Sequence, residues 1–125
     1  DETELIREKI LQFSETVDFL ILTGGTSVDP DDATKAAMRD AGVQLLQAGN
    51  PMQPGNNFTI GYLADKPVCA IPAAALFFKI TAFDVFLPRL VADDPISSDE
   101  LAALSVGGLC HFCEICRYPI CPFGR

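Results

Sequence analysis

Apolar residues recur with two different spacings in the first half of the chain. Residues 3–13 carry apolar side chains three and four positions apart, which predicts a helix. Residues 17–22 form a short, nearly unbroken apolar run, which predicts a strand buried on both faces. Residues 32–41 again have helical spacing and stop before Gly42, a common helix end. Residues 43–48 predict a second strand, so helix and strand alternate.

The second half begins with residues 49–57, a segment dense in glycine, proline and asparagine that predicts turns. Two strand-like runs at residues 58–63 and 67–71 flank a short polar turn and predict a hairpin. Residues 73–87 are strongly apolar and rich in helix-forming residues. We therefore predict a well-buried helix there, ending near Pro88.

The pattern changes after one more short helix. Ser97 or Ser98 is placed to cap this helix, which runs through Leu104, and the sequence beyond it lacks periodicity. Because helices and strands alternate before that point, we predict an α/β domain with a mainly parallel central sheet over residues 1–104. An irregular, cysteine-rich tail is expected over residues 105–125.

The charge of the chain excludes one class of partner. Seventeen acidic residues against nine basic ones give a net charge of −8, whereas binding a nucleic acid requires a basic face. A small anionic ligand held by backbone amides remains compatible with this charge.

No apolar run reaches the roughly 18 residues of a membrane span and no signal peptide is visible, so we expect a cytoplasmic protein with no membrane contact. The chain starts at Asp1 rather than Met, so the sequence is compatible with a further segment before Asp1.

The chain leaves its first predicted strand through a glycine pair, Gly24 and Gly25. Glycine has no Cβ, so a ligand can approach this backbone closely. The backbone amides of Thr26 and Ser27 could then hold an anion near the start of the following helix. Three aspartates follow in the same turn, namely Asp29, Asp31 and Asp32. They could bind a metal ion or polar ring atoms of a ligand, or their only role could be to cap the helix.

The turn at residues 54–57 has two interpretations. It could be a second backbone loop that faces the same crevice as the glycine pair, or it could only connect two strands.

Four cysteines lie within the last sixteen residues, separated by two, two and four residues, and a proline follows the last one. This clustering is unlike a secreted disulfide framework and predicts a metal site. An iron–sulfur cluster of the 4Fe–4S type is favoured by the close spacing and the proline, with zinc as the rival, and a reduced, unstructured tail is the alternative. Cys69 lies in an apolar run and is expected to be an inert core thiol. The predicted metal ligands are Cys110, Cys113, Cys116 and Cys121.

Three segments, in order, resemble the molybdopterin-binding domain family of molybdenum-cofactor biosynthesis proteins, of the MoeA, MogA and gephyrin type. Residues 23–35, TGGTSVDPDDATK, are similar to the family's glycine-rich strand exit. Residues 54–63, PGNNFTIGYL, resemble its Pro-Gly loop, and residues 68–90 resemble its Leu-Pro-Gly-Asn-Pro segment with the following helix. The resemblance covers about residues 5–92 and implies a three-layer αβα fold.

The resemblance implies a site for molybdopterin, a pterin that carries a phosphate and a dithiolene. The amides of Thr26 and Ser27 would bind its anionic end, and Asp32 would match an aspartate linked to metal insertion or adenylyl-group chemistry. The chain departs from the family at Asp29, which replaces a glycine, and at residues 73–75, where three alanines replace Gly-Asn-Pro. The residues expected to bind the ligand are Thr23, Gly24, Gly25, Thr26, Ser27, Asp32, Thr34, Pro54, Gly55 and Pro72.

We therefore predict a protein that binds molybdopterin or the molybdenum cofactor and acts in its biosynthesis, carriage or delivery. One alternative is a molybdotransferase with Asp32 as a catalytic metal ligand. The other is a redox or interaction module that acts through its cysteine tail, which resembles tails on a group of bacterial members of the family. The expected partners are the pterin, a molybdoenzyme or biosynthetic protein, and further copies of the chain in a homo-oligomer.

Overall fold

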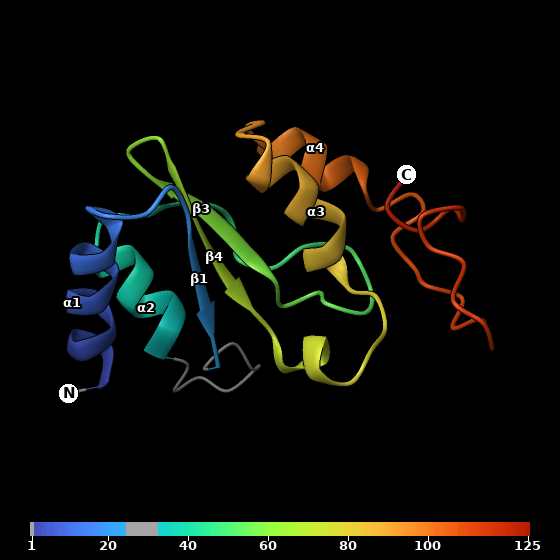
Figure 1. Ribbon diagram of the computed structural model, residues 1–125, viewed down its shortest axis with the longest axis horizontal. Helices are drawn as coiled ribbons and strands as arrows, with labels where there is room; N and C mark the ends of the chain where they lie inside the picture. Colours follow the sequence, from blue (N-terminus) through green and yellow to red (C-terminus); the bar gives the residue numbers. More distant parts are fainter. Residues whose placement is uncertain (1, 25–32) are drawn as a thin grey trace.

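The structure, a computed structural model, describes residues 2–24 and 33–125. Helices and strands alternate up to β2, and a hairpin and three helical segments follow (Figure 1). The elements are α1 (Glu2–Ser14), β1 (Leu20–Thr23), α2 (Ala33–Asp40), β2 (Gln44–Gln47), β3 (Thr59–Leu63), β4 (Lys66–Ile71), the 3₁₀ helix η1 (Ala73–Leu76), α3 (Ala82–Val91) and α4 (Ser98–Ala103).

The four strands form one sheet in the order β1-β4-β3-β2. β1 runs parallel to β4, whereas β3 is antiparallel to both β4 and β2. The prediction of a mainly parallel sheet is therefore wrong, and the sheet is mixed. The cause lies in the connection between β3 and β4, which consists of Ala64 and Asp65 alone. Two residues can only reverse the chain, because a parallel crossover needs about a dozen residues or more.

Helices cover both faces of this sheet, which gives the expected three layers (Figure 1). Val68 and Ala70 of β4 belong to a core cluster that also contains residues of α1 and α2. Cys69, between them, belongs to the other cluster, with residues of α3 and α4. Successive side chains of a strand point to opposite faces, so β4 contributes to both cores.

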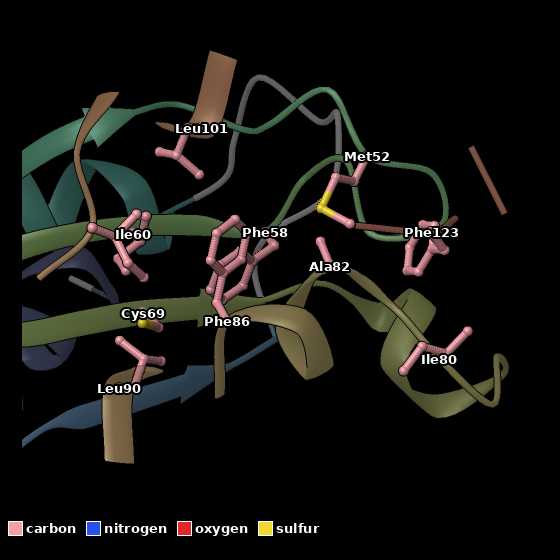
Figure 2. Close-up of a cluster of buried hydrophobic side chains, with 11 residues drawn as sticks. Met52, Phe58, Ile60, Cys69, Ile80, Ala82, Phe86, Leu90, Leu101 and Phe123 are labelled. Carbon is pink, nitrogen blue, oxygen red and sulfur yellow. The ribbon is translucent and has the colours of Figure 1, made fainter. Parts of the chain in front are cut away.

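The core under α3 and α4 contains the larger aromatic side chains. Phe58 and Phe86 stack with their ring centroids 5.6 Å apart, and Phe83 packs against Phe58 at 5.9 Å. Figure 2 shows the first two rings between Ile60 of β3 and Met52. Burial of such a side chain stabilises a fold by roughly 2–3 kcal/mol. The stack therefore fixes the chain that leads into β3 against α3.

The predicted long helix over residues 73–87 is wrong. η1 ends at Leu76, and α3 begins only at Ala82 and continues past Pro88. Thr81 starts the new helix through a capping box, because its backbone N–H and its hydroxyl both donate to the Asp84 carboxylate. Leu76 and Phe77 are 81% and 80% exposed, so the apolar composition of this segment did not indicate burial.

β1 also differs from its prediction as a strand buried on both faces. It begins at Leu20, three residues later than expected, and it is an edge strand of the described sheet. Leu20 is buried, but Ile21 is 38% exposed and Thr23 is exposed. A four-residue edge strand has one hydrogen-bonded neighbour here, which leaves part of its surface in solvent.

Candidate functional site

The carboxyl ends of β1 and β4 leave the sheet side by side. Thr23 is opposite Ile71 in the parallel register, so the residues that follow them, Gly24 and Pro72, lie at the same edge. In open α/β sheets, the carboxyl edge of parallel strands is a common place for ligands. The structure thus brings together three predicted site residues from two separate segments. We call this region the β1/β4 edge.

The start of β3 lies at the same edge. Thr59 is opposite Ala70 in the antiparallel pair, so the chain before Thr59 arrives where β1 and β4 end. The predicted turn at residues 54–57 precedes this point by two residues. All three segments of the predicted site therefore approach one edge of the sheet.

Gly24 is suited to an open strand exit. Its φ angle is +86°, a left-handed conformation that glycine adopts readily, and a Cβ built there would have no atom of residues 2–24 and 33–125 within 4 Å. Its carbonyl oxygen accepts a hydrogen bond of 3.2 Å from the hydroxyl of Thr34, which is 4% exposed in the first turn of α2. Thr34 therefore fixes the strand exit to the helix. The predicted residues Gly25, Thr26, Ser27 and Asp32 lie outside the described residues.

Pro54 and Gly55 have internal contacts. The carbonyl of Pro54 accepts a hydrogen bond of 3.0 Å from the N–H of Ala82, at the start of α3. Gly55 has a φ of +104°, and a Cβ there would lie 2.7 Å from the Ala82 nitrogen. Both residues are buried. Their described contacts hold the turn against α3, so the turn is part of the framework of the edge.

Asn50 organises the same turn, and our sequence analysis did not identify it. Its Nδ2 donates to the carbonyls of Gly55 and Phe58 at 2.8 and 3.1 Å, and its Oδ1 accepts from the N–H of Met52 at 2.9 Å. Asparagine in a turn often bonds to nearby backbone in this way. Its position in a Gly-Asn-Pro sequence at residues 49–51 was the available signal.

Pro72 is buried, but the residues after it are mostly exposed. Its carbonyl accepts a hydrogen bond of 3.0 Å from Ala75, which closes the first turn of η1. The side chain of Ala73 is exposed, so its methyl group is not packed into the interior. The β1/β4 edge is therefore bordered by a short helical turn and by the exposed Leu76 and Phe77.

Comparison with known proteins is consistent with this arrangement. Residues 1–92 match the family model described as "Probable molybdopterin binding domain". The chain belongs to the molybdopterin-binding domain family. It is also 29% identical over 108 residues to a Methanocaldococcus jannaschii protein named "Putative molybdopterin biosynthesis protein MJ0666". That alignment covers 83% of this chain and 27% of the archaeal protein, so the chain spans about a quarter of that relative's length.

A pocket of about 360 Å³ lies between the molybdopterin-binding domain and its C-terminal tail. Pro54 and residues 77–80 form one side of the pocket, and residues of the tail form the other. Three further aromatic residues contribute to its walls, namely Phe112, Tyr118 and Phe123. Burial is the main factor that raises the pKa of Tyr118, and the negative charges of Asp84 and Cys121 add to it. The tail is thus folded against the domain.

All four cysteines of the tail line this pocket, and all five cysteines of the chain are free thiols. Within residues 2–24 and 33–125, no three or more His, Cys, Asp or Glu side chains are gathered closely enough to hold a metal ion. The predicted tail site therefore remains a prediction, as does the domain boundary at residue 104. Cys69 is fully buried in the core, as expected, and burial raises its pKa to about 12.

No helix in the described part of the chain is long and apolar enough to cross a membrane.

Proposed function

We propose that this chain binds molybdopterin or the molybdenum cofactor at the β1/β4 edge and acts in biosynthesis, carriage or delivery of the cofactor. The observation that carries the proposal is the register of Thr23 opposite Ile71, which places the Thr-Gly exit of β1 beside Pro72. Two segments of the family motif, 48 residues apart in sequence, are adjacent because of this pairing. Membership of the family and the name of the archaeal relative support the same ligand.

The β1/β4 edge offers the two kinds of surface that molybdopterin needs. Space beside Gly24 allows an anionic group to approach the backbone, where N–H groups near the start of α2 and its helix dipole favour negative charge. The exposed Leu76 and Phe77 offer apolar area for a flat pterin ring. The turn at Pro54 and Gly55 holds this framework in place through its bond to Ala82.

Binding rather than catalysis is the function that we propose. Residues 73–75 are alanines, so this segment lacks a side-chain amide that could hydrogen-bond the ligand. Asp32 is the residue on which a transferase activity would depend. Asp32→Asn would leave binding within about threefold of the unchanged chain if the protein is a carrier, and it would abolish cofactor formation if the protein is a transferase.

Anaerobic isothermal titration with molybdopterin tests the site. Gly24→Ala should weaken binding by about tenfold, because the new methyl group would occupy the space beside the strand exit. Gly42→Ala is the matched control, since Gly42 has nearly the same φ of +87°, lies at the other end of α2, and has room for a Cβ. If both variants bind like the unchanged chain, or if that chain does not bind, the proposed site is wrong.

A further inference from the structure

We propose that Cys110, Cys113, Cys116 and Cys121 bind one metal centre through four thiolates, either a Zn²⁺ ion or a 4Fe–4S cluster. The first observation is that all four thiols line the same pocket of about 360 Å³. Cys113 and Cys116 are exposed, whereas Cys110 and Cys121 are half-buried against the core. Two of the proposed ligands are therefore packed against the core, and the other two lie at exposed positions of the tail.

The base of the tail is fixed to the domain at both ends. At its start, Leu109 pairs with Gln53, and at its end Phe123 is 3% exposed within the core. The N–H of Gly124 donates to the carbonyl of Gly107 at 3.1 Å, and a Cβ on Gly107 would lie 2.8 Å from the Pro122 carbonyl. The four cysteines thus lie on one loop with a closed base, although no three of them are gathered closely enough in the described residues to hold a metal ion.

The loop between these ends is held by side-chain contacts, with Tyr118 packed against the core and Phe112 against Phe78, and it has no regular secondary structure. Residues 111–120, all of which the structure describes, contain no helix or strand. Their large apolar side chains Phe112, Ile115 and Ile120 are exposed. A segment that buries so little apolar surface usually depends on a disulfide or a metal to hold one conformation, and these cysteines are not in disulfides.

The sulfur of Cys110 already has a backbone hydrogen-bond donor. The backbone N–H of Phe112 donates to the sulfur of Cys110 at 3.4 Å, and Phe112 takes a left-handed φ of +50°. Such a φ is uncommon for an aromatic residue and points to a local constraint. An N–H aimed at a sulfur stabilises negative charge on it, as around metal-bound thiolates.

Zn²⁺ and an oxidised 4Fe–4S cluster would bring the same net charge to the loop. Either centre, with four thiolates, has a net charge of about −2, and the pocket wall carries Lys79 and Arg117 together with the acidic Glu114. The exposed Cys113 and Cys116 must move toward Cys110 and Cys121 to complete the site.

The test uses the complete 125-residue chain, purified anaerobically with reduced thiols. Metal and sulfide analysis should give one zinc, or four iron and four sulfide, per chain. The metal-free chain is then titrated with Zn²⁺ against a chromophoric chelator, and separately reconstituted with sulfide and a mixture of Fe²⁺ and Fe³⁺, which together have the oxidation state of the oxidised cluster. Cys113→Ser and Cys116→Ser, both at exposed positions, should each weaken binding by at least about 100-fold.

Two control variants define the ligand set. Cys69→Ala should bind metal like the unchanged chain, because Cys69 is buried in the core of the domain. His111→Ala should also bind normally if the ligands are the four thiols. The proposal is overturned if the reduced chain binds neither metal centre, or if the two exposed-cysteine variants bind as well as the unchanged chain. It is overturned equally if His111→Ala abolishes binding while a tail cysteine proves dispensable. Far-UV circular dichroism confirms that each variant is folded.

Discussion

The backbone of Gln53 is hydrogen-bonded to the start of the tail, at Cys110 and at Gly108. The N–H of Cys110 donates to the carbonyl of Gln53 at 2.8 Å, and the N–H of Gln53 donates to the carbonyl of Gly108 at 2.7 Å. Gln53 directly precedes the Pro54–Gly55 turn at the β1/β4 edge. The first cysteine of the tail is therefore attached to the framework of the candidate site, next to the turn that α3 already holds in place.

Gly55→Ala should destabilise the fold strongly. A left-handed φ costs a residue with a side chain about 1–3 kcal/mol, and the new Cβ would also lie 2.7 Å from the backbone of Ala82. We expect a total loss of at least about 3 kcal/mol in urea unfolding. Gly42 has a similar φ, and a Cβ there would lie at an ordinary contact distance of 3.8 Å from the Leu63 side chain. Gly42→Ala should therefore lower the free energy of unfolding by only about 1 kcal/mol. Equal losses would show that the turn does not pack tightly on α3.

Asn50→Ala should lower the free energy of unfolding by about 2–3 kcal/mol. The change removes four hydrogen bonds, the longest of them 3.4 Å to the Asn56 carbonyl, and leaves the carbonyls of Gly55 and Phe58 without this donor. Asn56→Ala is the control, because Asn56 is exposed and its backbone carbonyl, which the substitution keeps, is the atom that accepts hydrogen bonds from Asn50. Chemical unfolding measures both variants, and a control as unstable as Asn50→Ala would contradict the role given to Asn50.

Cys69 should resist alkylation in the folded, metal-free chain. Its pKa of about 12 keeps the thiol protonated at about pH 8, and its side chain is fully buried. Mass spectrometry after iodoacetamide treatment should show four modified cysteines in the folded chain and five after unfolding. Because burial raises this pKa, the unfolded chain ionises first, and stability should fall as the pH rises above about 9. Rapid modification of Cys69 in the folded chain would contradict its burial.

Glu100→Gln should reduce the thermal stability slightly at neutral pH. Hydrogen bonds from the Ser97 backbone, then the Ser97 hydroxyl, and then Arg89 lower the pKa of Glu100. A lowered pKa stabilises the fold above the ordinary value of the carboxyl group, and this contribution is lost as the pH falls through the folded value. The melting temperatures of the two proteins should therefore converge at acidic pH, once the carboxyl group is protonated in both states. A difference that persists there would indicate a loss of packing instead of charge.

Local patterns were sufficient to predict those elements that short-range chemistry determines. The helical spacing of residues 3–13 predicts α1 to within one residue at each end. Ser97 caps α4 as predicted, since its hydroxyl accepts a hydrogen bond from the N–H of Glu100. The hairpin of β3 and β4 also agrees, because a short polar turn between two apolar runs has few alternatives.

Two predictions were wrong, one because apolar composition did not indicate burial and one because the length of a connection was not taken into account. The apolar segment after Pro72 was interpreted as one buried helix, but the capping box at Thr81 begins a new helix and leaves Leu76 and Phe77 in solvent. The sheet was expected to be mainly parallel, although the two-residue connection at Ala64 requires an antiparallel pair. For the candidate site, the family motif indicated which segments of the chain contribute residues. Their adjacency depends on the pairing of β1 with β4 across 48 residues, which no local pattern contains.

The bond between Thr34 and Gly24 has a consequence for protein engineering. It joins the residues on either side of the segment 25–32, so β1 and α2 fix the distance between the two points that this segment connects. Segments of equal length from relatives could therefore be exchanged here between the same two fixed ends. A set of such chimaeras would vary ligand preference on a constant scaffold.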